Sequence, residues 1–385
     1  MQKNLAVILD IGSSKVTVLA GERGVNNTFI IKSYAEREYS GFYSGEFIDK
    51  IEFESAVKTC LEKVEDNLSD KIKTIYVGVP GEFTLAVVKD ASMAYKKSKK
   101  IGEAELNELF DLGFENTSKK YTVINRSGIY FTLDDMRRVA DPVGERSSVL
   151  NGKISYILCE TAFIDAITPC LKNYGVKYIE FTSTALAEAL YLFEPEQRDR
   201  LALLVDCGYT TTSLSLIEGD GIVKQKSFAL GGAVLSAYLM QEFNLSPELA
   251  EKLKRKINLA CDEDTEENYC IIDGDKELFF PLKKVNNITK DFLDEVAENI
   301  DKCLTDVKND LPGYVKISLT GGGVSLIRGA KEHLSGRINM VVETIAPDFT
   351  HLNKPTDSSK IALLDLALNQ NPIKPKLFSG LFGKK

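Results

Sequence analysis

Residues 5–15 read LAVILDIGSSK, an apolar run that ends at Asp10 and leads into a turn containing Gly12. A continuous apolar run of this length predicts a strand that is buried on both faces. Glycine lets the backbone approach a ligand closely, and successive backbone N–H groups beside serine hydroxyls and a lysine offer donors to phosphate oxygens. We therefore predict a phosphate-binding turn formed by Asp10, Gly12, Ser13, Ser14 and Lys15.

Residues 201–212 repeat this pattern as LALLVDCGYTTT, and Asp206 lies 196 residues after Asp10. A single Asp-x-Gly turn is also compatible with an ordinary hairpin, but its repetition indicates a chain of two related halves. Two such turns that face each other across a cleft would hold a phosphate chain and one cation. Because Mg²⁺ keeps several waters and uses one or two carboxylates, we predict that Asp10 and Asp206 bind it through water. The second turn contributes Asp206, Gly208, Thr210, Thr211 and Thr212.

Three consecutive glycines, Gly321, Gly322 and Gly323, follow the buried apolar run 315–320 and precede a helical pattern. Bare backbone of this kind leaves room for a flat ligand, although a simple strand-to-helix turn is the alternative. Beside the two Asp-x-Gly turns, we expect these glycines to belong to the same ligand site.

The overall composition narrows the possible functions. The 385 residues carry a net charge of −8, which argues against broad nucleic-acid binding, because phosphate backbones attract clustered Lys and Arg. No apolar run is long enough for a transmembrane helix, and the first apolar run is too short for a secretory signal, so we expect a cytosolic chain. The two histidines lie in no motif and the seven cysteines form no CxxC pair, which disfavours a histidine-based triad, a zinc site and a disulfide framework.

The C-terminal tail differs from the rest of the chain, because residues 372–385 contain four lysines and no acidic residue. Two leucines and two phenylalanines recur with i, i+4 spacing and share one face of a helix. Such a segment predicts an interfacial membrane anchor on anionic lipid, whereas a frayed terminus or docking on the protein itself is the alternative. One such anchor binds weakly, so polymerisation would supply avidity. The predicted membrane-binding residues are Leu377, Phe378, Leu381, Phe382, Lys384 and Lys385.

These three turns, in this order, are similar to those of the actin, sugar-kinase and heat-shock-chaperone ATPase superfamily, and the chain resembles its FtsA family of bacterial cell-division proteins. The resemblance is carried by residues 9–16, 141–144, 250–254 and 317–323. It implies an α/β, actin-like ATPase fold, with two RNase H-like halves around a nucleotide cleft and an FtsA-type inserted subdomain. It also implies ATP and Mg²⁺ as ligands, with Glu251 near the ribose and with Lys254 and the three glycines in the nucleotide site.

The pattern of runs and the resemblance together predict the domain organisation. The first half carries an inserted α+β interaction subdomain, in which we expect only short strands, and the second half carries a peripheral subdomain. By resemblance, the peripheral subdomain receives the C-terminal peptide of FtsZ, and the inserted subdomain contacts the next subunit or later division proteins. The C-terminal helix is expected to pack back on the first half. The predicted bounds are 1–83 plus 166–198 for the first half, 84–165 for the inserted subdomain, 199–235 plus 313–355 for the second half, 236–312 for the peripheral subdomain, 356–370 for the C-terminal helix and 371–385 for the linker and tail.

The chain departs from the family pattern at the second turn, where Tyr209 and Thr210 occupy the positions of two expected glycines. The side chains there would crowd phosphates or alter their geometry. Rapidly hydrolysing members of the superfamily place a Glu or Gln at the connecting helix to orient the attacking water, and residues 182–185 offer no carboxylate. We therefore expect ATP binding with slow or negligible hydrolysis.

The resemblance implies an actin-like ATP-binding protein that polymerises and tethers the FtsZ ring to the inner face of the cytoplasmic membrane at the division site. Its implied partners are the FtsZ C-terminal peptide, further copies of itself, anionic lipids and other division proteins. A pilus-assembly ATPase of the same fold is the main alternative. A soluble sugar or acetate kinase and a heat-shock-type chaperone are further alternatives, but the former lacks such a tail and the latter needs a substrate-binding domain.

Overall fold

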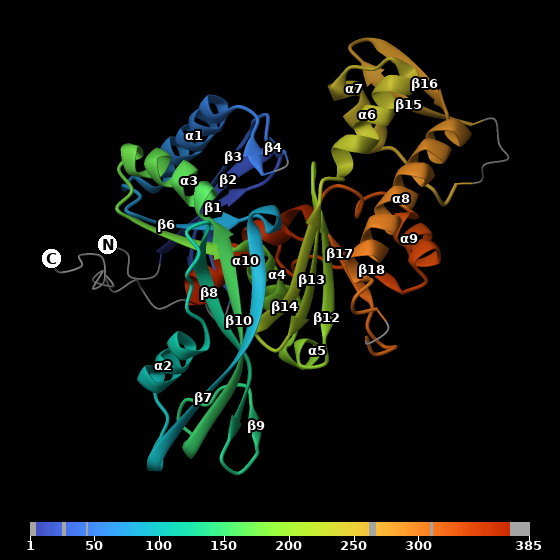
Figure 1. Ribbon diagram of the computed structural model, residues 1–385. Coiled ribbons are helices and arrows are strands. Elements are labelled where there is room, and N and C mark those ends of the chain that lie inside the picture. The colour runs from blue at the N-terminus through green and yellow to red at the C-terminus, as the bar shows by residue number, and fades with distance from the viewer. Residues whose placement is uncertain (1–4, 25–27, 44, 262–266, 309–310, 370–385) are drawn as a thin grey trace.

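The computed structural model describes residues 5–369 except 25–27, 44, 262–266 and 309–310. The predicted tail, with all six of its membrane-binding residues, therefore lies outside the described residues. Within the described part, two five-stranded sheets form the two halves, and each half carries one additional subdomain (Figure 1).

The first half is built on a sheet with the strand order β11-β6-β1-β2-β3, in which β1 pairs antiparallel with β2 and parallel with β6. Residues of β1 alternate between two cores: Val7 and Leu9 face α1 and α3, whereas Ala6 and Ile8 face α4 and α10. The strand is thus buried on both faces, as its continuous apolar run predicts. The elements are β1 Leu5–Ile11, β2 Lys15–Arg23, β3 Phe29–Glu38, β4 Phe42–Tyr43, β5 Glu46–Phe47, α1 Lys50–Leu68, β6 Thr74–Val79, η1 Gly81–Phe83, α3 Thr161–Tyr174, β11 Tyr178–Ser183 and α4 Thr184–Leu192.

The second half repeats this topology, because its sheet has the order β14-β13-β12-β17-β18 and β12 pairs antiparallel with β13 and parallel with β17. The predicted internal duplication is therefore present in the fold. The peripheral subdomain of α6, α7, α8 and the β15–β16 hairpin extends from it and shares its hydrophobic core. Because α6 begins at Gly232, the expected start of this subdomain at residue 236 falls inside a helix. The elements are α5 Pro195–Arg198, β12 Ala202–Cys207, β13 Thr212–Glu218, β14 Gly221–Phe228, α6 Gly232–Phe243, α7 Pro247–Lys254, β15 Asn268–Asp273, β16 Lys276–Pro281, α8 Leu282–Leu304, β17 Ile317–Thr320, α9 Ala330–Ile338, β18 Val342–Thr344 and η2 Pro355–Asp357.

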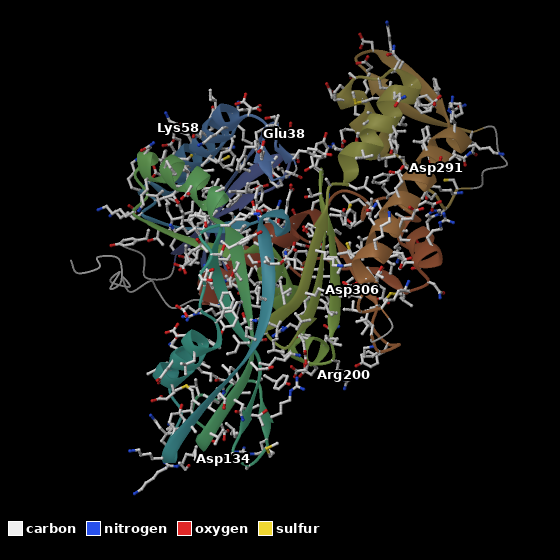
Figure 2. The ribbon with its side chains drawn as sticks, viewed as in Figure 1. Glu38, Lys58, Asp134, Arg200, Asp291 and Asp306 are labelled. Atoms are coloured by element: carbon white, nitrogen blue, oxygen red, sulfur yellow. The ribbon has the colours of Figure 1, made fainter. Side chains whose placement is uncertain are left out.

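The inserted subdomain is a separate sheet, with the order β7-β10-β8-β9 and its own apolar core around Leu109 and Ile154. It extends away from both halves, and Asp134 marks its far tip (Figure 2). Its strands are long rather than short, and α3 begins at Thr161, so the expected boundary at residue 165 falls inside a helix. We therefore assign residues 84–160 to this subdomain. Its elements are β7 Thr84–Lys100, α2 Glu103–Gly113, β8 Tyr121–Leu133, β9 Arg138–Val139 and β10 Arg146–Glu160.

The C-terminal helix α10, Ser358–Asn369, follows the second half in sequence but packs on the first half, as expected. Its buried residues, Ile361 to Leu364 and Ala367, join the core formed by β1 and α4. The Cβ of any residue replacing Gly21 in β2 would lie 2.8 Å from Leu364 Cδ2, which shows how closely the helix approaches the sheet. None of the described helices is both long and apolar enough to cross a membrane.

Candidate functional site

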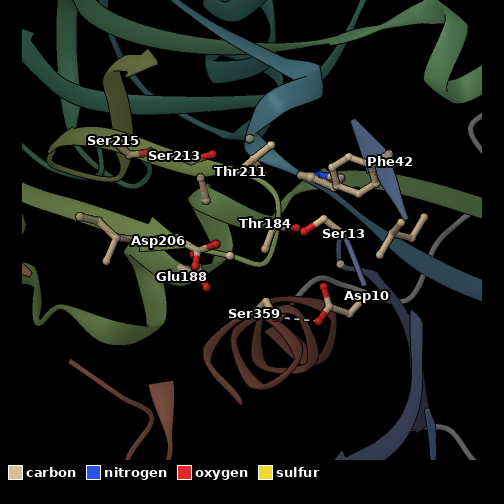
Figure 3. Close-up of a pocket in the computed structure, with 17 residues that line it drawn as sticks. Asp10, Ser13, Phe42, Thr184, Glu188, Asp206, Thr211, Ser213, Ser215 and Ser359 are labelled. Atoms are coloured by element: carbon tan, nitrogen blue, oxygen red, sulfur yellow. Dashed lines mark hydrogen bonds between the residues drawn. The ribbon is translucent and has the colours of Figure 1, made fainter. Parts of the chain in front are cut away.

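A cavity of about 90 Å³ lies where the two halves meet, at the turns that follow β1 and β12 (Figure 3). The first turn contributes Asp10, Gly12 and Ser13, and the second contributes Asp206, Gly208 and Thr211. The remaining wall includes Phe42, the segment 80–81, the start of α4, the serines of β13 and Ser359 of α10. The structure therefore brings together the two turns that the sequence predicts to face each other.

The two turns have the same local geometry. Gly12 N donates to Lys15 O at 2.9 Å, and Gly208 N donates to Thr211 O at 2.8 Å. A Cβ at either glycine would lie 3.1 Å from the accepting carbonyl oxygen, so both positions favour glycine for the same reason. The repeat seen in the sequence thus extends to individual hydrogen bonds.

The second turn is also bonded directly to the first half. Thr210 N donates to Ser13 Oγ and Thr210 Oγ1 donates to Phe42 O, each at 3.1 Å. The neighbouring Gly41 has φ +86°, and a Cβ there would lie 2.0 Å from Ser13 O. Thr210, which stands where the family pattern has glycine, therefore joins the two turns across the cleft.

Three carboxyl groups, Asp10, Asp206 and Glu188, line the cavity. Burial and the charge of Asp10 raise the pKa of Asp206 to about 6. Burial also raises the pKa of Asp10, although a hydrogen bond from Ser359 and the charges of Lys360 and Lys15 oppose this effect. In the part of the chain that the structure describes, no three acidic, histidine or cysteine side chains are arranged to hold a metal ion directly.

Glu188 is a site residue that the sequence argument missed. It lies one turn into α4, is 2% exposed and points into the cavity beside Asp206 (Figure 3). Burial, followed by the charges of Asp206 and Asp10, raises its pKa well above the usual value for glutamate. The expectation of no carboxylate concerned residues 182–185, and Glu188, three residues further along, brings a carboxyl group to the cavity. The available signal was one acidic residue within the otherwise apolar sequence TALAEALYL.

Some predicted residues lie away from the cavity. Lys15 Nζ pairs with Glu36 Oε2 at 3.0 Å, and this lysine remains partly exposed. Thr212 is fully buried and donates to Leu230 O at 2.6 Å. Its hydroxyl therefore forms a hydrogen bond inside the second half and does not face the cavity. Ser14 does not line the cavity either, and its carbonyl oxygen accepts a hydrogen bond from Tyr39 N at 3.1 Å.

The three glycines after β17 pack against the second turn. Gly323 N donates to Cys207 O at 2.7 Å, and a Cβ on Gly323 would lie 2.4 Å from Gly208 O. Gly321 has φ +84°, and its Cβ would lie 2.2 Å from Asp206 Oδ1. Close packing of protein backbone, rather than room for a ligand alone, therefore accounts for the glycines at 321 and 323.

Buried Lys254 and half-buried Glu251 form a polar cluster on α7, next to the second turn. Lys254 Nζ lies 2.5 Å from Glu251 Oε1 and donates to Gly232 O at 3.0 Å. Its ammonium group also lies 5.6 Å from the centre of the Tyr209 ring. Burial lowers the pKa of Lys254, although the charge of Glu251 opposes this effect. This cluster adjoins the second turn but does not line the cavity.

Comparisons with known proteins agree with this architecture. A model of the MreB/Mbl protein family matches residues 161–352. The cell division protein FtsA of Staphylococcus epidermidis is 22% identical over 380 residues, covering 96% of this chain and 80% of that protein. FtsA of Bacillus subtilis is 19% identical and covers 94% of this chain and 83% of that protein.

Solved structures are similar over nearly the whole chain. The PilM–PilN type IV pilus biogenesis complex aligns with a TM-score of 0.64 at 16% identity, covering 96% of this chain and 99% of the matched chain. MreB5 of Spiroplasma citri, solved bound to ADP, aligns with a TM-score of 0.56 at 13% identity. The alignment covers 95% of this chain and 96% of the matched chain. At such low identity these structures establish the fold alone, and they confirm the predicted actin-like fold.

Proposed function

We propose that this FtsA-like chain of the actin family binds a nucleotide between its halves, assembles into filaments and tethers the FtsZ ring to the cytoplasmic membrane. The observation that carries the proposal is the pair of equivalent turns at one cavity, because each presents glycine backbone and hydroxyl groups of the kind that bind phosphate. A structure of the related MreB5 was solved with ADP.

The donor set fits a hydrated Mg²⁺ ion. Asp10 and Asp206 supply hard carboxylate oxygens from opposite sides of the cavity, and the serine and threonine hydroxyls around them can hold its waters. A bound Mg²⁺ would neutralise phosphate charge in a cavity that already contains three carboxyl groups. Asp10 and Asp206 would orient the waters of the bound ion, whereas the backbone of the two turns would position the phosphates.

We propose that hydrolysis is slow. Burial, the largest cause of the raised pKa of Glu188, favours the neutral carboxyl form, which is a poor acceptor for the proton of an attacking water. In addition, Thr210 bonds the two turns to each other where the family pattern has flexible glycine. The nucleotide then acts mainly as a ligand that shifts conformation and assembly.

The peripheral subdomain offers a surface suited to the proposed FtsZ peptide. On the β15–β16 hairpin, Ile272 and Phe279 are 62% and 60% exposed. Exposed apolar side chains on a short hairpin are typical of a surface that binds a peptide. The membrane-binding part of the proposal rests on the sequence of the tail alone.

The test is co-sedimentation with vesicles that contain anionic lipid. We would compare the full chain with a chain ending at Pro372, each with ATP and Mg²⁺ and with or without FtsZ. We expect only the full chain to sediment and to carry FtsZ with it. A Phe378→Ser, Phe382→Ser double variant should stay in solution, whereas Ser379→Ala should behave like the wild type. If the full chain stays in solution under every condition, the tether proposal is wrong.

A pilus-assembly role is the second candidate, because the PilM–PilN complex shares the fold over nearly the whole chain. Binding of a synthetic FtsZ C-terminal peptide separates the two functions. Saturable binding by the isolated protein supports the division role. No binding, together with vesicle attachment by the tail, favours the pilus-assembly role instead.

A further inference from the structure

The first turn of α10 reaches the cavity and contacts both halves. Ser359 Oγ donates to Asp10 Oδ2 at 2.6 Å, which is the hydrogen bond drawn in Figure 3. The preceding hydroxyl, Ser358 Oγ, lies 2.7 Å from Thr320 Oγ1 at the end of β17. Two consecutive serines therefore join Asp10 of the first half to the third turn of the second half.

The position of this helical turn is firmly fixed. Lys354 N donates to Asp357 Oδ2 at 3.1 Å, and Lys360 Nζ pairs with Asp357 Oδ1 at 2.9 Å. Lys360 is only 3% exposed, and the four residues after it are fully buried against β1 and α4. A hydroxyl held on such a helix orients its partner more precisely than one on a loop.

We propose that Ser359 is a positioning residue that fixes the carboxylate of Asp10 for a hydrated divalent cation and thereby couples the cation–nucleotide site to α10. The inference rests on the proposed nucleotide and Mg²⁺ site. Carboxylates that bind metal are commonly held by a second hydrogen-bonding partner, and loss of that partner costs about 10- to 100-fold in metal affinity.

The coupling works in both directions. The hydrogen bond from Ser359 and the cation favour the same orientation of the Asp10 carboxylate, so each stabilises the other. Occupancy of the site therefore strengthens the docking of α10 on the first half. The described part of α10 runs to Asn369, so a change in the docking of this helix would act next to the linker and tail in sequence.

The experiment measures the Mg²⁺ dependence of nucleotide binding by the full chain. Fluorescent N-methylanthraniloyl-ADP is titrated at increasing Mg²⁺ with the wild type, Ser359→Ala, Ser359→Thr and Ser358→Ala. We expect Ser359→Ala to raise the half-saturating Mg²⁺ concentration about tenfold. Ser359→Thr retains the hydroxyl and should stay within about twofold of the wild type. Ser358→Ala is the matched control, because it removes the adjacent hydroxyl, which bonds Thr320 rather than Asp10.

Hydrogen exchange supplies a readout that a purely structural role would not change. Mg²⁺ and ADP should protect the amides of 358–369 in the wild type but not in Ser359→Ala. If the wild type depends on Mg²⁺ and Ser359→Ala has the same midpoint and the same protection, the positioning role is wrong and the nucleotide proposal stands. If the wild type binds no nucleotide at millimolar concentration, the proposed function is wrong and the coupling is wrong with it.

Discussion

At the scale of single residues, Thr210 bonds the second turn to the first half, and we expect these bonds to affect how easily the cleft accepts a phosphate. Its backbone N–H and its hydroxyl both bond the first half, so these bonds must break or rearrange before the two turns can separate. A net hydrogen bond contributes about 0.5–1.5 kcal/mol. This free energy opposes the binding of any ligand that requires the two turns to move apart.

We therefore expect Thr210→Ala to bind ADP about two- to tenfold more tightly than the wild type, because the hydroxyl bond to Phe42 O is lost. Isothermal titration calorimetry measures the change. Thr210→Ser keeps the hydroxyl and serves as the control, with affinity close to that of the wild type. Equal or weaker binding by Thr210→Ala would show that Thr210 supports the site rather than restrains it.

Site residues could be predicted from the sequence where a local pattern occurs twice. Glu188 was missed, because a single glutamate forms no such pattern. Asp10 and Asp206 were identified because each ends an apolar strand before a glycine turn, and the structure brings them to one cavity. Glu188 could not be placed, because a glutamate in a short helix can face solvent equally well unless the neighbouring elements are known. Lys15 and Thr212 belong to the motif but have partners elsewhere.

At the scale of elements, Glu65 joins three segments of the first half. This α1 carboxylate is only 6% exposed and accepts from Ile72 N before β6 and from Tyr174 OH at the end of α3, both at 2.8 Å. It also pairs with Lys71 Nζ at 2.6 Å. Burial alone would raise the pKa of Glu65, but these hydrogen bonds outweigh it and lower the pKa.

We predict that Glu65→Gln lowers the free energy of unfolding by about 1.5–3 kcal/mol at pH 7, because hydrogen bonds to a charged group are lost. A lowered folded-state pKa stabilises the protein above the unfolded pKa of about 4.3, and this contribution disappears as pH falls through the folded-state pKa. The difference between the two proteins should therefore shrink at acid pH. Urea unfolding from pH 7 to pH 3.5 measures it.

Glu62→Gln is the matched control on the same helix. Its side chain is 53% exposed and lies 3.8 Å from Lys58, so its loss should change stability by less than about 0.5 kcal/mol. A Glu65→Gln effect of equal size at both pH values would mean that packing, and not charge, ties the three segments together.

The elements also show which strands a sequence can predict. β1 and β12 are short, continuous apolar runs, and both appear where expected. β10 was not predicted, because its sequence RSSVLNGKISYILCE mixes polar and apolar residues and the strand contains several bulges. Its length comes from pairing with β7 and β8 on both sides, which no local pattern encodes.

At the scale of the whole molecule, the inserted subdomain, which belongs to the first half in sequence, also contacts the second half away from the cavity. Ser155 of β10 donates to Ile222 O of β14 at 2.7 Å. Gly219, in the β13–β14 turn, has φ +57°, and a Cβ there would lie 2.1 Å from Ile129 O of β8. Because β13 lines the cavity with Ser213 and Ser215, the strand connects the proposed nucleotide site to this contact.

Glu218 at the end of β13 is the charged part of this contact. Its carboxylate oxygens lie 3.1 Å from Arg138 and 2.8 Å from Lys153, both in the inserted subdomain, and its side chain is only 17% exposed. The two ion pairs cross from the second half to a subdomain that belongs to the first half in sequence. Relative movement of the halves must therefore strain or break them.

We expect Glu218→Gln to release bound ADP about two- to tenfold faster, because partly exposed ion pairs contribute about 0.2–1 kcal/mol each and their loss favours the open cleft. Stopped-flow displacement of a fluorescent ADP measures the release rate. Asp220→Asn, two residues further along the same turn, is the control, because Asp220 pairs with Arg198 of α5 at 2.6 Å and not with the inserted subdomain. If both variants release ADP at the wild-type rate, the cleft opens without moving the inserted subdomain. If both accelerate release equally, the stability of the turn, and not the bridge between the halves, controls opening.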